Sequence, residues 1–148
     1  MKKIFNPRTN SAAMDTALLL GRMAIAALML THGLPKLQML LSGGAVQFPS
    51  IMGMGARLSL ALAVFAEVGC SIFILTGFAT RLATVPLIIT MLVAALSVHA
   101  ADAFEIKEKA LLYLAVYLIL IFMGSGKFSL DYFIHTNKQT AYGARVQQ

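Results

Sequence analysis

Four long hydrophobic segments alternate with short polar connections along the chain. They cover residues 16–37, 57–77, 81–99 and 106–124. A helix needs roughly 20 mostly apolar residues to cross the hydrocarbon core of a bilayer, and each segment comes close to that length. The pattern therefore predicts an all-α membrane protein, a four-helix transmembrane bundle, in which residues 43–55 form the longest connection.

The composition supports this class of protein. Of the 148 residues, 59% are hydrophobic and 12% are charged, whereas about 25% of the residues of an ordinary soluble domain are charged. The formal net charge is +6, but the basic residues concentrate at the chain ends and at the borders of the hydrophobic segments. Basic residues in those places orient membrane helices, so the charge does not indicate a nucleic-acid partner.

The basic residues also predict the orientation of the bundle. An even number of spans puts both chain ends on one side, and that side carries Lys2, Lys3, Arg8, Arg81, Lys127, Lys138 and Arg145. The opposite connections and their borders carry Lys36, Arg57, Lys107 and Lys109. Because cytoplasmic connections are enriched in Lys and Arg, we expect both termini in the cytoplasm. The chain then divides into a cytoplasmic segment at 1–15, a transmembrane domain at 16–132 and a polar, mobile cytoplasmic tail at 133–148.

Two charged residues lie well inside the hydrophobic segments. Each such residue costs about 2.5–3.5 kcal/mol on insertion scales and normally faces a partner in the bundle. Arg22 lies in the first segment and Glu67 near the middle of the second, so we expect these two side chains to pair. Two interpretations of Glu67 stay open: a structural ion pair that joins two helices, or a proton-handling carboxylate that faces a ligand.

The first segment carries further polar residues on the stripe that Arg22 begins. With about 100° of rotation per residue, Gly33 and Lys36 share this stripe and His32 lies beside it. Gly33 would let a second helix approach closely. Pro35 is expected to help end the helix. The residues around it are thus predicted to form the outer wall of a polar site inside the bundle.

A cluster of polar residues is predicted at the outer ends of the spans. Alternation of the spans brings six of them to one membrane face: His32, Lys36, His99, Asp102, Glu105 and Glu108. They could bind a transition metal, hold a headgroup or ligand, or provide ordinary interfacial polarity. No H-x-x-x-H or E-x-x-H pair is present, so we predict no metal site. Asp102 is placed to orient His99 as an i,i+3 partner.

The end of the fourth segment has its own pattern, GSGKFSLD. Gly124 and Gly126 favour the end of a helix there. Asp131 is expected either to cap a short following turn or to pair with Arg81. The only cysteine of the chain, Cys70, excludes an internal disulfide and a C-x-x-C pair. No haem-ligating histidine pair and no nucleotide-binding fingerprint are present, so no intrinsic cofactor is expected.

These elements, taken in order, resemble the DoxX family of small membrane proteins. The resemblance is carried by Arg22, the HGLPK element at residues 32–36, Glu67, the GFATR turn at residues 77–81 and the closing segment at residues 124–131. It covers residues 16–132. It implies a four-helix protein of the bacterial inner membrane that is linked to quinone or respiratory redox chemistry, as a subunit of a quinone-dependent oxidoreductase.

A quinone site needs an apolar slot for the tail, donors for the carbonyl oxygens and a proton source. The candidate ligand-binding residues are Arg22, His32, Lys36, Glu67, His99 and Glu108, with Glu67 and His32 as the candidate catalytic residues. A bound quinone and an oxidoreductase partner subunit, or a homodimer, are then expected. The alternative is a non-enzymatic membrane scaffold, or a carrier for a lipid or small hydrophobic molecule, that holds a headgroup in the same polar interior.

Overall fold

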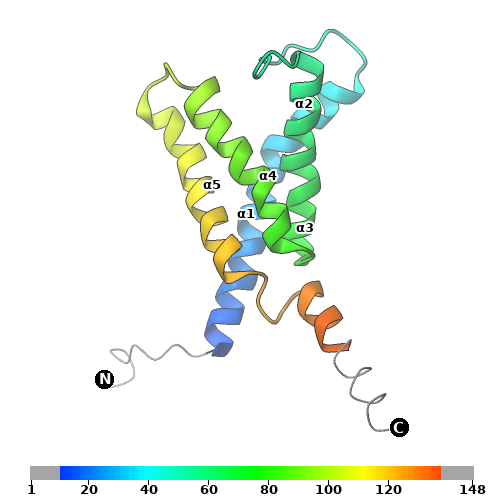
Figure 1. Ribbon diagram of the computed structural model, residues 1–148, viewed down its shortest axis with the longest axis vertical. Helices are drawn as coiled ribbons and strands as arrows, with labels where there is room; N and C mark the ends of the chain where they lie inside the picture. The colour runs from blue at the N-terminus through cyan, green and yellow to red at the C-terminus, as the bar shows by residue number, and fades with distance from the viewer. Residues whose placement is uncertain (1–10, 138–148) are drawn as a thin grey trace.

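The computed structural model describes residues 11–137, which are mostly helical and contain no strand (Figure 1). The first helix, α1, spans Ser11–Leu41. The second runs without a break through α2 (Ala56–Val64), η1 (Phe65–Cys70) and α3 (Ser71–Thr76). The third joins α4 (Thr80–Val93) to η2 (Ala94–Val98), and the fourth, α5, spans Phe104–Met123.

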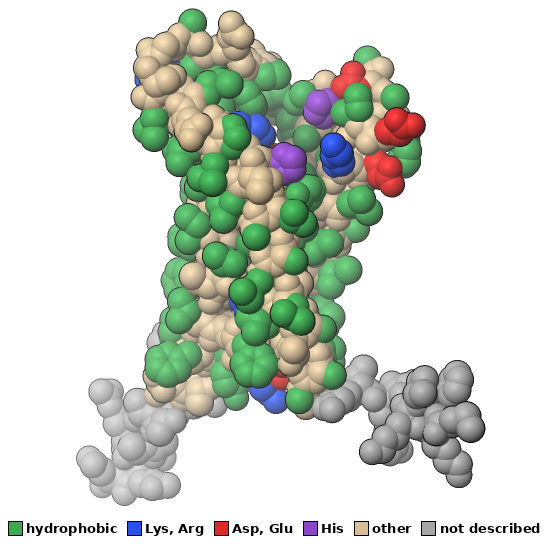
Figure 2. All heavy atoms as spheres, turned by 180° about the vertical axis from the view of Figure 1, so that it is seen from behind, with side chains coloured by type: hydrophobic (Ala, Val, Ile, Leu, Met, Phe, Trp, Pro, Cys, Tyr) green, Lys and Arg blue, Asp and Glu red, His purple; other side chains and the backbone are tan. Residues whose placement is uncertain are grey.

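The predicted four-helix bundle is confirmed. The first three helices are each long and apolar enough to cross a membrane. The fourth, α5, carries its charged residues in its first two turns, is apolar from Ala110 onward and packs along α4. Large hydrophobic side chains cover the outside of the bundle, as Figure 2 shows for one face. A hydrophobic exterior of this extent is expected where helices face lipid.

The helices extend beyond the predicted domain boundaries. Residues 11–15, predicted as part of a cytoplasmic segment, belong to α1, and a short helix that begins at Leu130 continues to residue 137 (Figure 1). The prediction that Pro35 helps end the first helix is wrong, because α1 continues to Leu41. Proline removes one backbone hydrogen bond, a loss that membrane helices tolerate. The rest of the predicted segment 1–15 and of the tail 133–148 lies outside the described residues.

Two short π-helical turns interrupt the second and third helices. The first, η1, contains Glu67, and the second, η2, ends directly before His99. In η2 the His99 backbone N–H donates to the carbonyl oxygen of Ala94, five residues earlier, at 2.9 Å. Such turns are rare and are frequently found at functional sites. η1 lies in the middle of the second helix, and η2 forms the last turn of the third.

Gly33 allows α1 and η1 to pack in direct backbone contact. A β-carbon added at Gly33 would lie 2.7 Å from Cγ2 of Val68 and 3.0 Å from Cβ of Glu67. It would also lie 3.1 Å from the backbone carbonyl carbon of Glu67, which cannot move aside as a flexible side chain can. The predicted close approach at Gly33 is thus confirmed, and it fixes where Glu67 lies relative to α1.

Gly33→Ala is therefore expected to lower the free energy of unfolding by about 1–3 kcal/mol, the usual cost of overpacking a buried contact. The matched control is Gly21→Ala in the same helix, where an added β-carbon meets nothing within 4 Å. That control should be neutral or stabilising, because alanine favours a helix over glycine by up to about 1 kcal/mol. Denaturant titrations of both variants in one detergent provide the comparison. Equal effects of the two substitutions would contradict the close approach.

Candidate functional site

A cavity of about 370 Å³ lies at the splayed end of the bundle, between α2, the third helix and the loop that connects α1 to α2. Its walls are mostly apolar, with Leu62 and Ala63 from α2 and Ile89, Val93 and Val98 from the third helix. Seen from behind, this end of the molecule is hollowed between its two lobes, and histidine, lysine and acidic side chains gather there (Figure 2). The few polar residues that line the cavity thus lie among apolar wall residues.

The cavity contains an ion pair between two helices. The ammonium group of Lys36 on α1 donates a hydrogen bond to Oε1 of Glu67 on η1. The Glu67 side chain is 3% exposed and that of Lys36 is 31% exposed. Removing one partner of a buried pair leaves an uncompensated charge. The pair is therefore what allows a carboxylate to sit in this apolar part of the bundle.

Each member of the pair retains capacity for a ligand. An ammonium group has three N–H donors, and within residues 11–137 only the bond to Glu67 is made. The Lys36 ammonium also lies 5.9 Å from the centroid of the Phe48 ring, within the range of a cation–π contact. The second oxygen of Glu67, Oε2, is buried and has no hydrogen-bond partner among the described residues.

The predicted pairing of His99 with Asp102 is confirmed. Nδ1 of His99 lies 2.7 Å from Oδ2 of Asp102, and the imidazole lines the cavity. An ionised carboxylate only accepts hydrogen bonds, so Nδ1 carries the proton in this pair. The other ring nitrogen, Nε2, is then an acceptor when the ring is neutral and a donor when the ring is protonated.

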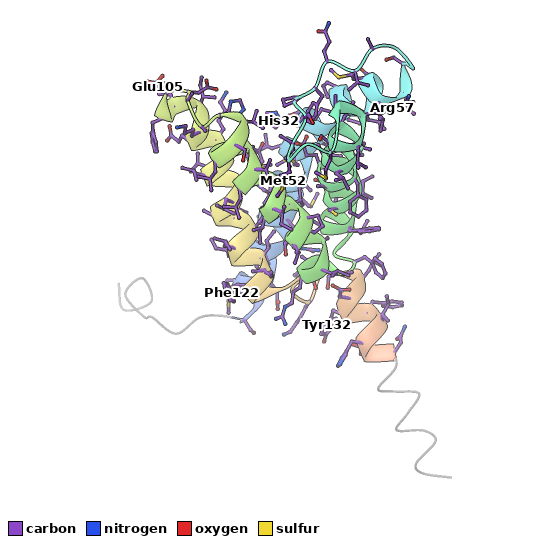
Figure 3. The ribbon with its side chains drawn as sticks, turned by 45° about the horizontal axis from the view of Figure 1, so that its top comes forward. His32, Met52, Arg57, Glu105, Phe122 and Tyr132 are labelled. Atoms are coloured by element: carbon purple, nitrogen blue, oxygen red, sulfur yellow. The ribbon has the colours of Figure 1, made fainter. Side chains whose placement is uncertain are left out.

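His32 and Glu108, two more of the predicted site residues, do not line the cavity. His32 is exposed, and its ring packs edge-on against Tyr113 at a centroid distance of 5.7 Å. Tyr113 in turn stacks on the buried Tyr117 at 6.3 Å. Figure 3 shows His32 near the gap between the lobes and Glu105 at the outer end of α5. Glu108 is exposed on α5 as well.

The predicted pairing of Arg22 with Glu67 is wrong. Gly33 and Lys36 are the residues of α1 that contact Glu67, and Arg22 lies eleven residues before Gly33, which is about 16 Å along a helix. Arg22 is fully buried at the opposite end of the bundle. There its guanidinium donates to the carbonyl oxygens of Ile74 at 3.4 Å and Phe128 at 2.5 Å. Lys36, and not Arg22, is the counter-ion of Glu67.

Asp131 has a role that neither sequence prediction anticipated. Its carboxylate accepts the backbone N–H groups of Ala79 at 2.7 Å and Thr80 at 3.2 Å, and thus caps the start of α4 from a distant part of the chain. The predicted pairing with Arg81 is not made, and Arg81 instead donates to the carbonyl oxygen of Phe122 at 3.1 Å. One signal was present in the sequence: Ala79, at the N-cap position, has no side-chain acceptor of its own.

The loop that covers the cavity was also missed as part of the site. Phe48, Ile51, Met52 and Met54 from this loop line the cavity. Ser59 of α2 holds the loop in place through two hydrogen bonds. Its hydroxyl accepts the Ile51 N–H at 3.0 Å and donates to the carbonyl oxygen of Gly55 at 2.8 Å. The available signal was the presence of large apolar residues in a glycine-rich connection, where polar residues are usual.

A comparison with protein-family models finds the same family that the sequence motifs resemble. The DoxX family model matches residues 17–100, more than half of the chain. This range runs from α1 to the end of the third helix and includes Lys36, Glu67 and His99. It leaves out α5 and the segment that follows it. No curated protein and no solved structure matches the chain.

Proposed function

Because this chain belongs to the DoxX family of membrane proteins, we propose that it serves as a quinone-linked membrane subunit of an oxidoreductase system. The observation that carries the proposal is the ion pair of Lys36 and Glu67, which lines an apolar cavity between helices. A ligand with a polar head and an apolar tail matches such a site, because ligand pockets are mostly apolar with a few oriented polar groups.

The donors and acceptors of the cavity suit a quinone headgroup. Lys36 has N–H donors left for one carbonyl oxygen, and His99, when protonated, offers a second donor. The apolar walls from α2 and the third helix would accommodate the ring and the first part of the tail. The volume of about 370 Å³ lies at the lower end of the range for small-molecule sites, roughly 300–1,000 Å³.

Two groups of the cavity can exchange protons with such a ligand. Glu67 is held by Lys36 through one oxygen only. His99 is oriented by Asp102, which leaves Nε2 to take up or release a proton. A bound quinone would supply two-electron redox chemistry, and we propose that a partner oxidoreductase supplies the electrons. The residues of this chain bind the headgroup, orient it and hold protons beside it.

We also propose that the bundle lies in a bacterial inner membrane with both termini in the cytoplasm. The support is the excess of basic residues on the side of the termini. Arg81 and Lys127 belong to that excess and lie within the described residues, while Lys2, Lys3, Arg8, Lys138 and Arg145 lie outside them. The cavity beside Lys36 would then open toward the outer side of the membrane.

The test is to purify the protein gently from its own membrane and to identify the bound molecules by native mass spectrometry and solvent extraction. We expect a quinone in roughly equimolar amount, and its loss in a His99→Ala variant, whose altered side chain lines the cavity. The matched control is His32→Ala, which changes an exposed histidine that does not line the cavity and should retain the quinone.

Two results would overturn the proposal. The first is wild-type protein that carries only bulk phospholipid and does not bind an added quinone, which would favour the lipid carrier or scaffold. The second is loss of the quinone in His32→Ala but not in His99→Ala, which would place the site on the side of Tyr113 and Tyr117 instead.

A further inference from the structure

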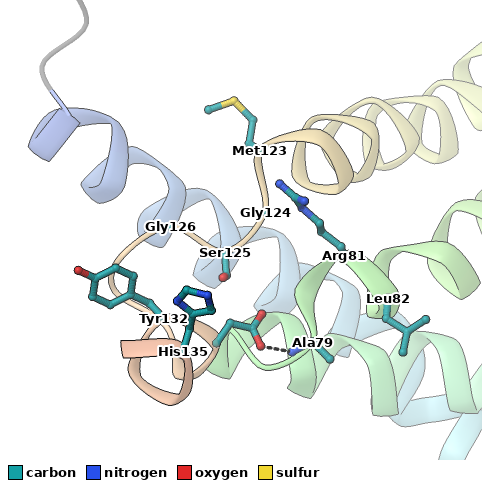
Figure 4. Close-up of a pocket in the computed structure, with 10 residues that line it drawn as sticks. Ala79, Arg81, Leu82, Met123, Gly124, Ser125, Gly126, Tyr132 and His135 are labelled. Carbon is teal, nitrogen blue, oxygen red and sulfur yellow. Dashed lines mark hydrogen bonds between the residues drawn. The ribbon is translucent and has the colours of Figure 1, made fainter. Parts of the chain in front are cut away.

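A second cavity, of about 510 Å³, lies at the opposite end of the bundle (Figure 4). It is open and is bounded by the start of α4, the end of α5 and the short helix that begins at Leu130. Figure 4 shows Ser125 near its centre, with Arg81 on one side and Tyr132 and His135 on the other. Four side chains with N–H or O–H donors thus line one cavity.

The charges around this cavity favour an anion. Arg81 uses one nitrogen, Nη2, to bond the carbonyl oxygen of Phe122, and its exposed guanidinium has further N–H donors. The one carboxylate in the lining, Asp131, is already satisfied by the backbone N–H groups that begin α4. The buried guanidinium of Arg22 also interacts electrostatically with Asp131. Each oxygen of Asp131 thus already accepts one backbone bond, while Arg81 keeps N–H donors for a ligand.

Exposed apolar side chains lie in and beside the lining of the cavity, as the acyl chains of a lipid would require. Leu82 and Met123 are part of its lining and are exposed. Further exposed hydrophobic side chains stand close to the lining residues along the chain: Phe122, Phe128, Leu130 and Phe133. A cavity at the start of α4 and the end of α5 with exposed apolar and donor side chains suits the border between hydrocarbon core and headgroups.

We infer that this cavity binds the phosphate group of an anionic phospholipid. The guanidinium of Arg81 and the donors of Ser125, Tyr132 and His135 take the phosphate oxygens, and the acyl chains follow the exposed side chains of Leu82 and Met123. Charge-assisted bonds from arginine to phosphate are among the stronger hydrogen bonds in proteins. The site is separate from the cavity beside Lys36 and does not depend on the proposed quinone.

The test measures lipid binding by native mass spectrometry on delipidated full-length protein, with phosphatidylglycerol and phosphatidylcholine as probes. We expect preferential binding of phosphatidylglycerol, and an about fivefold loss of that preference in Arg81→Gln, the effect of one basic residue at an anionic surface. His135→Gln changes an exposed side chain and should show a smaller loss in the same direction. Arg57→Gln, an exposed arginine at the other end of the bundle, is the matched control and should bind as the wild type does.

Three outcomes would overturn the inference. Equal binding of the two lipids, which both contain a phosphate, would show that the cavity does not select the net negative charge of an anionic phospholipid. An equal loss in Arg57→Gln and Arg81→Gln would show general surface attraction instead of a defined site. Inorganic phosphate that binds the delipidated protein as tightly as phosphatidylglycerol does would show a site for free phosphate, in which the apolar surroundings play no part.

Discussion

Lys36→Met is expected to lower the free energy of unfolding in detergent by about 3 kcal/mol, the lower end of the cost of breaking a buried ion pair. The reason is the position of Glu67, whose side chain is 3% exposed and whose second oxygen has no partner among the described residues. Without Lys36, the carboxylate must either stay charged in an apolar cavity or take up a proton. Equilibrium unfolding in mixed detergent measures the loss.

A double-mutant cycle separates the pair from a general effect of the substitution. Glu67→Gln in the Lys36→Met background should recover part of the loss, because the unpaired charge is then gone. Lys109→Met removes an exposed lysine from α5 and should change the stability by less than about 0.5 kcal/mol. Additive losses at Lys36 and Glu67 would show that the two side chains do not stabilise one another.

The same cycle applied to Arg22 and Glu67 should give no coupling. Arg22 bonds the carbonyl oxygen of Ile74, seven residues beyond Glu67 on the second helix, which is about 10 Å along a helix, and the two side chains share no hydrogen-bond partner. Distant substitutions usually add within about 0.3–0.5 kcal/mol. A coupling energy above 1 kcal/mol between these residues would contradict the arrangement and restore the pairing that the sequence suggested.

The fold was largely predictable because one physical constraint dominates it. A helix that crosses a bilayer must be about 20 residues long and apolar, and that requirement sets the number and the approximate limits of the four helices. The ends of the helices were less predictable. The helix α1 continues past Pro35 to Leu41, because a membrane helix tolerates a missing backbone hydrogen bond where the sequence stays apolar.

The candidate site was predictable in its residue types but not in its pairing. Glu67, Lys36 and His99 were all identified, since polar groups near a bilayer interior must find partners. The partner of Glu67 depends on the axial offset between the first and second helices. The contact of Gly33 with Val68 and Glu67 determines this offset. The sequence pattern gives the face of each helix but not this offset. The π-helical turns, which set the direction of Glu67 and His99, also have no simple sequence signal.

The other large expected effect is at Arg22, which holds the segment after α5 onto the bundle. Its guanidinium bonds the carbonyl oxygen of Phe128 in that segment and that of Ile74 at the end of α3. The nearby Asp131 bonds the start of α4 through its carboxylate and the carbonyl oxygen of Gly77 through its N–H, at 3.0 Å. Arg22 is therefore the buried centre of the contact between α1, the turn at residues 77–80 and the closing segment.

Arg22→Met should lower the free energy of unfolding by about 3–5 kcal/mol. It leaves the partly buried carbonyl oxygen of Phe128 without its side-chain donor, leaves that of Ile74 with only the backbone N–H of Gly77, and leaves Asp131 without a positive neighbour. Hydrogen exchange should rise in residues 124–137 more than in the rest of the chain, since this segment loses its contact with α1. Arg22→Lys keeps the charge but not the planar fork of donors, so it should recover only part of the stability.

The control is Arg81→Met, which removes an exposed arginine with one backbone bond at the same end of the bundle. If both arginine substitutions to methionine cost the same and exchange in the closing segment is unchanged, Arg22 does not anchor it.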